Sequence, residues 1–293
     1  MVFFPGESKK TRTKLKRGRI MKLIRTIALL SLFLLSGWNS HAKDPVKKRI
    51  VVIATAPDHA WNTHMYSDEC KLLVKCLNQN PGVEAVFSAD LDWPKDPKVL
   101  DGVKGIVYYS RSAGDIVFDP KRRKETAKLF DSGVGFATVH WATATNDAKL
   151  GPDYLELLGG WFHLNHSGLN VGKYTLQQLD PAHPICNGWL PYPLHDEIYL
   201  NLKFHPATKP LVKVTINGKD QIVAWVLERK GPSGGRSFGT TLGHFHDNFR
   251  IEAFRRMIVN GILWSVGIEV PKEGAKVNAT KEDLTLPPPS PVK

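Results

Sequence analysis

The stretch Gly133-Val134-Gly135-Phe136-Ala137-Thr138-Val139-His140-Trp141-Ala142-Thr143 decides the fold. Its residues from Val134 to Val139 are small, apolar or β-branched, which is typical of a strand buried on both faces of a parallel sheet. His140 follows at the point where such a strand would leave the sheet. Because ligands of open α/β sheets bind outside the carboxyl ends of the strands, His140 is a candidate functional residue. A buried histidine that is hydrogen-bonded to a backbone carbonyl is the alternative.

Segments on both sides of this stretch alternate between buried strands and amphipathic helices. We expect a helix after residue 62, because an apolar stripe with helical spacing runs from Cys70 to Leu77. A second helix is expected from Asp119-Pro120 to about residue 130. The alternation predicts a parallel, doubly wound sheet in a single three-layer α/β domain, residues 43–270. The other expected strands lie at 50–54, 83–87, 105–109, 171–179, 198–204, 222–227 and 236–242.

The two ends of the chain are expected to lie outside this domain. A basic segment starts at Met21, an apolar run extends from Ile27 to Leu35, and Ser40-His41-Ala42 resembles a cleavage site. This pattern predicts a signal peptide within residues 1–42, a true start at Met21, and a periplasmic or secreted protein that meets a membrane only through this peptide. An uncleaved anchor is the alternative. Residues 271–293, which contain Pro287-Pro288-Pro289, are predicted to be a disordered tail.

The charge of the chain does not indicate a nucleic-acid-binding protein. The sequence has 40 Lys and Arg residues against 28 Asp and Glu residues, a formal charge of +12. Residues 1–42 hold nine of these basic residues and one acid, so the cleaved chain would carry +4. Basic residues do not cluster in the remaining sequence, which argues against the basic face that nucleic-acid binding requires.

The three cysteines, Cys70, Cys76 and Cys186, do not indicate a disulfide framework. Cys70 and Cys76 would lie on different faces of the expected helix, since six residues correspond to about 240° of rotation. We expect all three to be buried apolar residues. No local motif supports a cysteine nucleophile.

Seven of the eleven histidines gather in or beside segments where strands are expected to end or loops to begin. This clustering carries more weight than any single position, because a lone histidine is often a buried structural residue. The polar segments are Asp58-His59 with His64, His140, His163 with His166, Asp196-Glu197, and His244 with His246.

Two of these segments have a spacing with chemical meaning. His244 and His246 would point the same way if a strand continued through them, and could then bind one metal or act as base and substrate donor. Ordinary loop hydrogen bonds are the alternative. Asp196 and Glu197 must face opposite sides of a strand, so one should point inward and need a histidine or sugar hydroxyl as its partner. A solvated turn is the alternative there.

Several segments together resemble the ThuA-like family, named for trehalose utilisation. They are Ile53 to His64, Gly133 to Trp141, Gly159-Gly160-Trp161-Phe162, Asp196-Glu197-Ile198-Tyr199, and Gly235 to His246, the most specific of the five. The resemblance covers about residues 48–270 and implies a class I glutamine amidotransferase-like fold with a mostly parallel, flavodoxin-like sheet. It also implies a role in sugar catabolism that involves 3-keto sugars. Amidotransferases of this fold carry a nucleophilic cysteine after the central strand, where this chain has His140-Trp141, so glutaminase activity is not expected.

These observations lead to the hypothesis of an exported enzyme that acts on a small carbohydrate or keto-sugar derivative, as a hydrolase, lyase or isomerase. Catalytic roles are assigned to His140, His244, Glu197 and Asp196. Substrate contacts are assigned to His59, His64, Trp141, His166 and Phe245. A divalent, zinc-like cofactor would be held by His140, His244 and His246. A non-catalytic sugar-binding module and a partner domain of a periplasmic assembly are the alternatives, and the oligomeric state is open.

Overall fold

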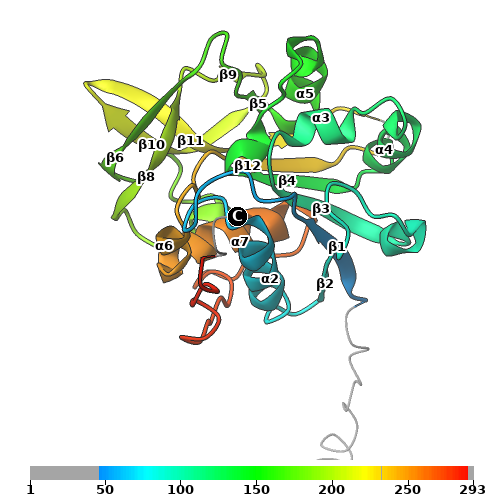
Figure 1. The fold of residues 1–293 in the computed structure, drawn as a ribbon, viewed down its shortest axis with the longest axis horizontal. Coiled ribbons are helices and arrows are strands. Elements are labelled where there is room, and N and C mark those ends of the chain that lie inside the picture. The colour runs from blue at the N-terminus through cyan, green and yellow to red at the C-terminus, as the bar shows by residue number, and fades with distance from the viewer. Residues whose placement is uncertain (1–45, 232, 290–293) are drawn as a thin grey trace, which may run out of the picture. The chain divides into compact units, whose positions relative to one another are not determined.

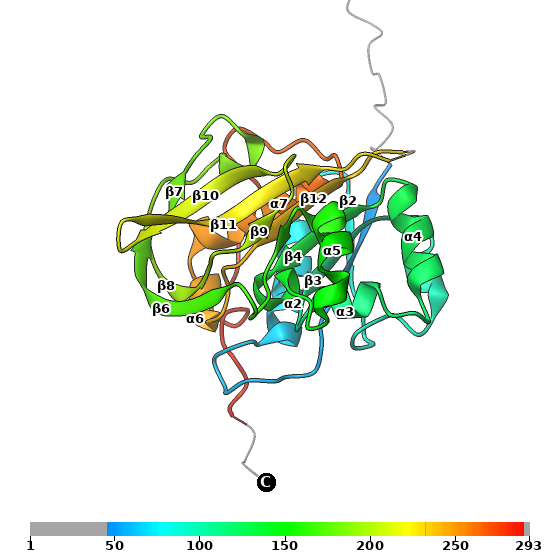
Figure 2. The same ribbon diagram turned by 90° about the horizontal axis from the view of Figure 1, so that it is seen from above.

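An eight-stranded sheet forms the centre of the computed structural model, which describes residues 46–231 and 233–289. The strand order is β2-β1-β3-β4-β12-β11-β10-β7 (Figure 1; β7 is labelled in Figure 2). Parallel pairing joins the strands from β2 to β12, and antiparallel pairing joins β12 to β11, β10 and β7. The bounds are β1 Lys48–Ile53, β2 Val83–Phe87, β3 Val103–Tyr109, β4 Gly135–Val139, β7 Gln177–Gln178, β10 Lys209–Ile216, β11 Lys219–Glu228 and β12 Arg236–Thr240. The predicted mostly parallel α/β sheet is therefore confirmed, with β4 between β3 and β12.

Helices cover both faces of this sheet, which gives the predicted three layers (Figure 1). Along β1, Ile50 and Val52 pack into the core that contains α2 and α7, whereas Val51 and Ile53 pack into the core that contains α3, α4 and α5. This alternation follows from the two-residue period of a strand. The helices are α2 Tyr66–Leu77, α3 Ala113–Val117, α4 Arg123–Asp131, α5 Gly151–Leu158, α6 His246–Phe249 and α7 Glu252–Ser265, with short 3-10 helices η1 Pro97–Leu100, η2 His140–Thr143, η3 Ala148–Leu150 and η4 Pro184–Cys186.

Two small antiparallel sheets adjoin the main one. β6, Gly168–Thr175, pairs with β8, Pro193–Leu200, and β5, Gly160–Trp161, pairs with β9, Lys203–Phe204. Figure 2 shows β6 and β8 running together beside α6. The predicted strand 171–179 is thus divided between β6 and β7. The predicted strand 198–204 begins earlier than expected, at Pro193, so that the two adjacent acids lie inside β8.

The C-terminal segment differs from its prediction. Residues 271–289 pack on the domain, and Ala275 and Val277 are each 1% exposed. The amide side chain of Asn80 accepts from the backbone nitrogen of Lys276 at 2.9 Å and donates to its carbonyl at 3.1 Å. Asn260 accepts from the backbone nitrogen of Ala275 at 2.9 Å. Side-chain amides therefore satisfy the backbone of this proline-rich segment, and the prediction of disorder is wrong for residues 271–289.

The predicted leader, residues 1–42, lies outside the described residues. Within residues 46–231 and 233–289, no helix combines the length and apolar character needed to span a bilayer. All three cysteines are buried and free, as expected. Burial raises the pKa of Cys76 to about 11 and that of Cys186 to about 12, and it also raises the pKa of Cys70. The reactive thiolate form is therefore disfavoured at all three positions.

Candidate metal centre

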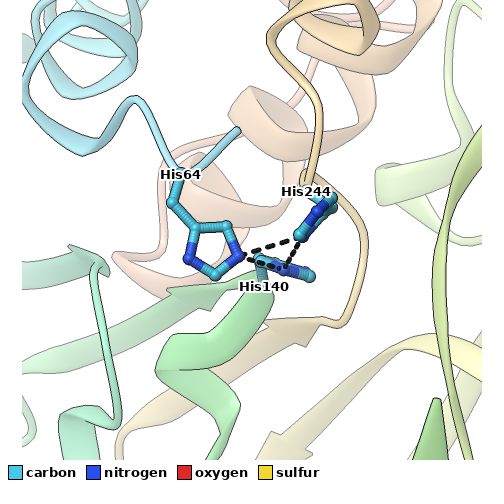
Figure 3. A group of neighbouring side chains, drawn as sticks. All are labelled: His64, His140 and His244. Carbon is cyan, nitrogen blue, oxygen red and sulfur yellow. Dashed lines mark hydrogen bonds between the residues drawn. The ribbon is translucent and has the colours of Figure 1, made fainter. Parts of the chain in front are cut away.

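Three imidazole rings converge at the carboxyl-end edge of the parallel strands (Figure 3). His64 follows β1, His140 follows β4 directly, and His244 follows β12. The Nε2 atom of His64 lies 2.9 Å from Nε2 of His140 and 3.0 Å from Nδ1 of His244. The third separation, between His140 Nε2 and His244 Nδ1, is 3.2 Å. All three side chains are buried, so three nitrogen atoms face one another away from bulk water.

The backbone at these positions is unusual. His64 has φ 49° and His140 has φ 59°, both in the left-handed region, and Gly243, just before His244, has φ 114°. A non-glycine residue in this region costs on the order of 1–3 kcal/mol and persists only where the surrounding structure fixes it. The fold therefore holds two of the three histidines in strained conformations, which is common at functional sites.

Hydrogen bonds define which nitrogen of two rings faces the centre. Nδ1 of His140 donates to the carbonyl of Thr241 at 2.7 Å, and Nδ1 of His64 donates to Oδ1 of Asp58 at 2.9 Å. In a neutral imidazole only one nitrogen carries a proton. The Nε2 atoms of His64 and His140 are therefore lone-pair acceptors that point at each other. A cation between them would satisfy both, and so would neutral donors, Nδ1–H of His244 at 3.0 and 3.2 Å and the Tyr199 hydroxyl, 3.3 Å from His140.

Burial keeps the three rings neutral. It lowers the pKa of His64 to about 2, that of His244 to about 4, and that of His140 well below its ordinary value. The neighbouring histidines lower all three pKa values further. The neutral ring is the form that binds a metal ion, so an ion could bind here without first displacing protons from imidazolium groups.

The geometry fits a zinc-like ion. Nitrogen ligands about 2.0–2.1 Å from a tetrahedral zinc ion lie about 3.3 Å from one another, and the three separations observed are 2.9, 3.0 and 3.2 Å. Metal-binding histidines usually donate their second ring N–H to a carboxylate or a backbone carbonyl. Asp58 and the Thr241 carbonyl serve His64 and His140 in this way. The three facing nitrogens therefore match the expected metal ligands, and Asp58 and the Thr241 carbonyl match the acceptors that usually hold such ligands in place.

Glu197 and Tyr199 reach this centre from β8. They are two residues apart and so share one face of the strand. Oε2 of Glu197 lies 3.7 Å from His140 Nε2 and 3.6 Å from His244 Nδ1, and the Tyr199 hydroxyl lies 3.3 Å from His140 Nε2. Burial raises the pKa of Glu197, and it raises the pKa of Tyr199 well above its ordinary value. Tyr199 thus remains a neutral donor beside a carboxyl group that can exchange a proton.

A cavity of about 370 Å³ opens next to the three histidines. His59 and Trp141, both assigned to substrate contacts from the sequence, line it together with His64 and Glu197. The remaining lining residues are Ala144, Thr145, Asn146, Phe162, His163, Leu164, Asn165, Leu169 and Tyr199. This volume lies within the range of small-molecule sites.

Asp196 lies behind the centre instead of in it. Its carboxylate is fully buried and accepts hydrogen bonds from the backbone nitrogens of Gly243 at 2.6 Å, His244 at 3.0 Å and Glu197 at 2.9 Å. Burial raises the pKa of this carboxyl to about 7. These contacts fix the loop that presents His244, so the structure gives Asp196 a positioning role in place of the predicted catalytic one.

His246 does not join His244, and its assignment as a metal ligand requires correction. β12 ends at Thr240, and His246 is the first residue of α6, so no strand continues through the two histidines. Nδ1 of His246 contacts Oε1 of Glu69, and Nε2 lies 2.9 Å from the carbonyl of Leu284. Both ring nitrogens are engaged away from the centre. His64, assigned to substrate binding from the sequence, takes the third position.

Two other predicted substrate contacts lie outside the set of residues that line the cavity. Phe245 stacks on His195 with ring centroids 4.9 Å apart. His166 packs against Trp161, at a centroid distance of 4.8 Å. Its neighbour His163 lines the cavity instead. The sequence shows that this loop is rich in imidazole groups, but the direction of each ring depends on the loop conformation.

Three further residues that contact the histidines of the centre are not predicted from the sequence. Asp58 stands out there only as a polar neighbour of His59, and no pattern assigns a role to Tyr66 or Tyr199. The Tyr66 hydroxyl lies 3.1 Å from Oδ2 of Asp58, to which it donates, and 2.8 Å from Nδ1 of His64. A signal exists for Tyr199 alone, because it follows Glu197 by two residues in a strand.

Comparisons with known proteins agree with this architecture. The ThuA family model, described as trehalose utilisation, matches residues 49–265. A putative ThuA-like protein from Bacteroides uniformis has a similar structure, with a TM-score of 0.58 and 17% identity over 82% of this chain and 99% of that one. No curated protein matches the sequence.

Two other solved structures align less closely. One is a glutamine amidotransferase from Thermotoga maritima, with a TM-score of 0.37 and 9% identity over 75% of this chain and 96% of that one. The other is a glutamine amidotransferase from Methylobacillus flagellatus, with a TM-score of 0.37 and 10% identity over 72% of this chain and 73% of that one. The family model, by contrast, spans most of the sequence, and so the chain belongs to the ThuA family, whose description is trehalose utilisation.

Proposed function

We propose that this protein is a metal-dependent enzyme of carbohydrate catabolism, in which His64, His140 and His244 hold one zinc-like ion. The observation that carries the proposal is the convergence of three buried nitrogen atoms within 2.9–3.2 Å, of which two are fixed as lone-pair acceptors. Membership of a family described as trehalose utilisation supports a carbohydrate-related role. The predicted leader is part of the same proposal and implies export from the cytoplasm.

The groups around the centre are suited to proton transfer on a sugar or keto-sugar. A bound divalent ion would polarise a carbonyl or hydroxyl oxygen of the ligand. Glu197, 3.6–3.7 Å from two of the ring nitrogens, is placed to take a proton from the ligand or return one. Tyr199 would donate a hydrogen bond to an oxygen that gains negative charge. Such a set serves a lyase, isomerase or hydrolase equally well.

Metal content tests the proposal directly. The chain is purified without a histidine tag, dialysed against zinc, and analysed for bound metal. We expect about one zinc ion per chain, and loss of that ion in His140→Ala and His244→Ala. His205→Ala is the matched control, because His205 pairs with Glu156 away from the centre.

The outcomes separate the parts of the proposal. If the wild type bound zinc, manganese and iron no more tightly than the His140→Ala variant does, a metal centre would be excluded. The wild type could also bind the metal and a ligand tightly and yet, like Glu197→Gln, turn over no sugar or keto-sugar. That result would favour the sugar-binding module over the enzyme.

A further inference from the structure

The cavity beside the metal centre has a rim whose chemistry differs from that of its floor. The floor carries His64, Tyr199 and Glu197, which are buried or nearly so. The rim carries Leu164, which is 73% exposed, and Leu169, which is 49% exposed. A polar floor and an apolar rim imply a ligand with two different ends.

The two rim leucines are brought together from different elements. Leu164 lies in the loop after β5, and Leu169 lies on β6. Phe162, which is 4% exposed, and the half-buried Trp141 continue the apolar wall of the same cavity. A single exposed leucine on a surface needs no explanation. Two at the mouth of one cavity that is also lined by aromatic rings form a surface that an apolar group would cover.

The charge of the cavity limits the ligand further. Among the described residues that line it, Glu197 is the one acid, and none is Lys or Arg. Phosphate and carboxylate groups are usually recognised by Arg or Lys. Apart from the proposed ion, a sugar phosphate would meet a carboxyl group and no cationic side chain among these residues, so an uncharged ligand fits better.

We infer that the site takes an uncharged glycoside with an apolar aglycone, an aryl or alkyl group, that lies against Leu164 and Leu169 while the sugar faces the three histidines. This inference rests on the proposed function, since it names the class of carbohydrate that the site accepts. It adds a specificity determinant, formed by the two leucines, to the proposed metal-dependent chemistry.

The test compares probes that differ only at the aglycone. Phenyl and methyl D-glucosides of both anomeric forms, and free phenol, are titrated into the zinc-supplied chain by calorimetry. We expect the phenyl glucoside of one anomer to bind about tenfold more tightly than its methyl counterpart, since a phenyl ring buries far more apolar surface than a methyl group. The double variant Leu164→Gln with Leu169→Gln should remove most of this preference and leave zinc affinity unchanged.

Val171→Gln is the matched control. Val171 is 53% exposed and lies on β6 two residues after Leu169, but it is not among the residues that line the cavity. It should leave the preference for the phenyl glucoside intact. Because all three side chains are substantially exposed, the variants should fold, and circular dichroism checks this.

The possible results have different consequences. Equal binding of phenyl and methyl glucosides, or a preference that survives the double variant, would overturn the inference. Binding of phenol that depends on the two leucines, with no binding of any glucoside, would support the apolar subsite and reject the carbohydrate function. No binding of any probe by the zinc-loaded chain would overturn the inference and leave the metal centre standing.

Discussion

Oδ1 of Asp58 accepts a hydrogen bond from Nδ1 of His64 at 2.9 Å, and this contact determines which nitrogen of His64 faces the other two imidazoles. The carboxyl group also receives the Tyr66 hydroxyl at 3.1 Å. Both partners fix its orientation. Asp58 is therefore a supporting residue of the proposed metal centre, although it does not face the ion site itself.

Asp58→Asn should weaken zinc binding. The amide can still accept a hydrogen bond from His64, but it no longer increases the basicity of the ring, and its NH₂ group can select the wrong tautomer. The expected loss of zinc affinity is about 10–100-fold, measured by competition with a chelator. Asp119→Asn is the control, since Asp119 accepts from the backbone nitrogen of Lys121 on the surface. Equal affinities in wild type and Asp58→Asn would show that Asp58 does not support the site.

Asp196→Asn distinguishes a positioning role from a catalytic one. The carboxylate accepts from three backbone N–H groups, and an asparagine must direct its NH₂ group at one of them. Leaving buried donors unpaired should lower the free energy of unfolding by about 1–3 kcal/mol. Urea unfolding measures this loss, and zinc affinity should fall with it because the loop carries His244. An unchanged unfolding curve with abolished activity would instead restore the catalytic assignment made from the sequence.

The positions of the strands were predictable, but the convergence of the histidines was less so. A run such as Val134 to Val139 has one physical solution, a strand buried on both faces, and the residue after it must lie at the sheet edge. The sequence therefore places His140 correctly. That both rings turn toward the same point depends on the left-handed backbone at His64 and His140, and no spacing rule predicts such conformations for residues other than glycine.

His246 also shows that spacing in the sequence does not determine where a side chain points. Spacing alone suggests that it accompanies His244, but the strand stops six residues earlier, at Thr240, and the turn directs the ring to Glu69. The prediction for the tail is wrong for a related reason. Its prolines indicate disorder, whereas the amide groups of Asn80 and Asn260 that bind its backbone lie far away in the sequence.

The pair formed by Glu69 and His246 should make stability depend on pH. Burial raises the pKa of Glu69 to about 7, and hydrogen bonding to Glu69 raises the pKa of His246 against the effect of burial. As pH rises, Glu69 and His246 therefore keep their protons in the native state at pH values where the unfolded state has already released them. By linkage, the stability contributed by these protons is present at low pH and is lost as pH rises from about 4.5 to 8.

Comparison with Glu69→Gln isolates this effect. Glutamine does not titrate, so the unfolding free energy of wild type minus that of the variant should fall by about 3 kcal/mol between pH 4.5 and pH 8. Urea titrations in the presence of a chelator measure it without a contribution from bound metal. The other buried histidines have lowered pKa values and act in the opposite direction, but they are present in both proteins and cancel in the difference. A difference that stays constant with pH would show that Glu69 is ionised throughout.

Tyr199→Phe should separate ligand recognition from metal binding. The hydroxyl lies 3.3 Å from His140 Nε2 and faces the cavity, but His140 keeps its bond to Thr241 without it. Zinc affinity should therefore stay within about twofold of wild type. Ligand affinity should fall about fivefold, the equivalent of one neutral hydrogen bond, measured by calorimetry with the phenyl glucoside that binds best.

Tyr192→Phe is the control, because the buried Tyr192 hydroxyl has no hydrogen-bond partner among the described residues, and its removal should leave both affinities unchanged. A loss of zinc in Tyr199→Phe would mean that the phenol supports the ion directly, and Tyr199 would then belong to the metal shell.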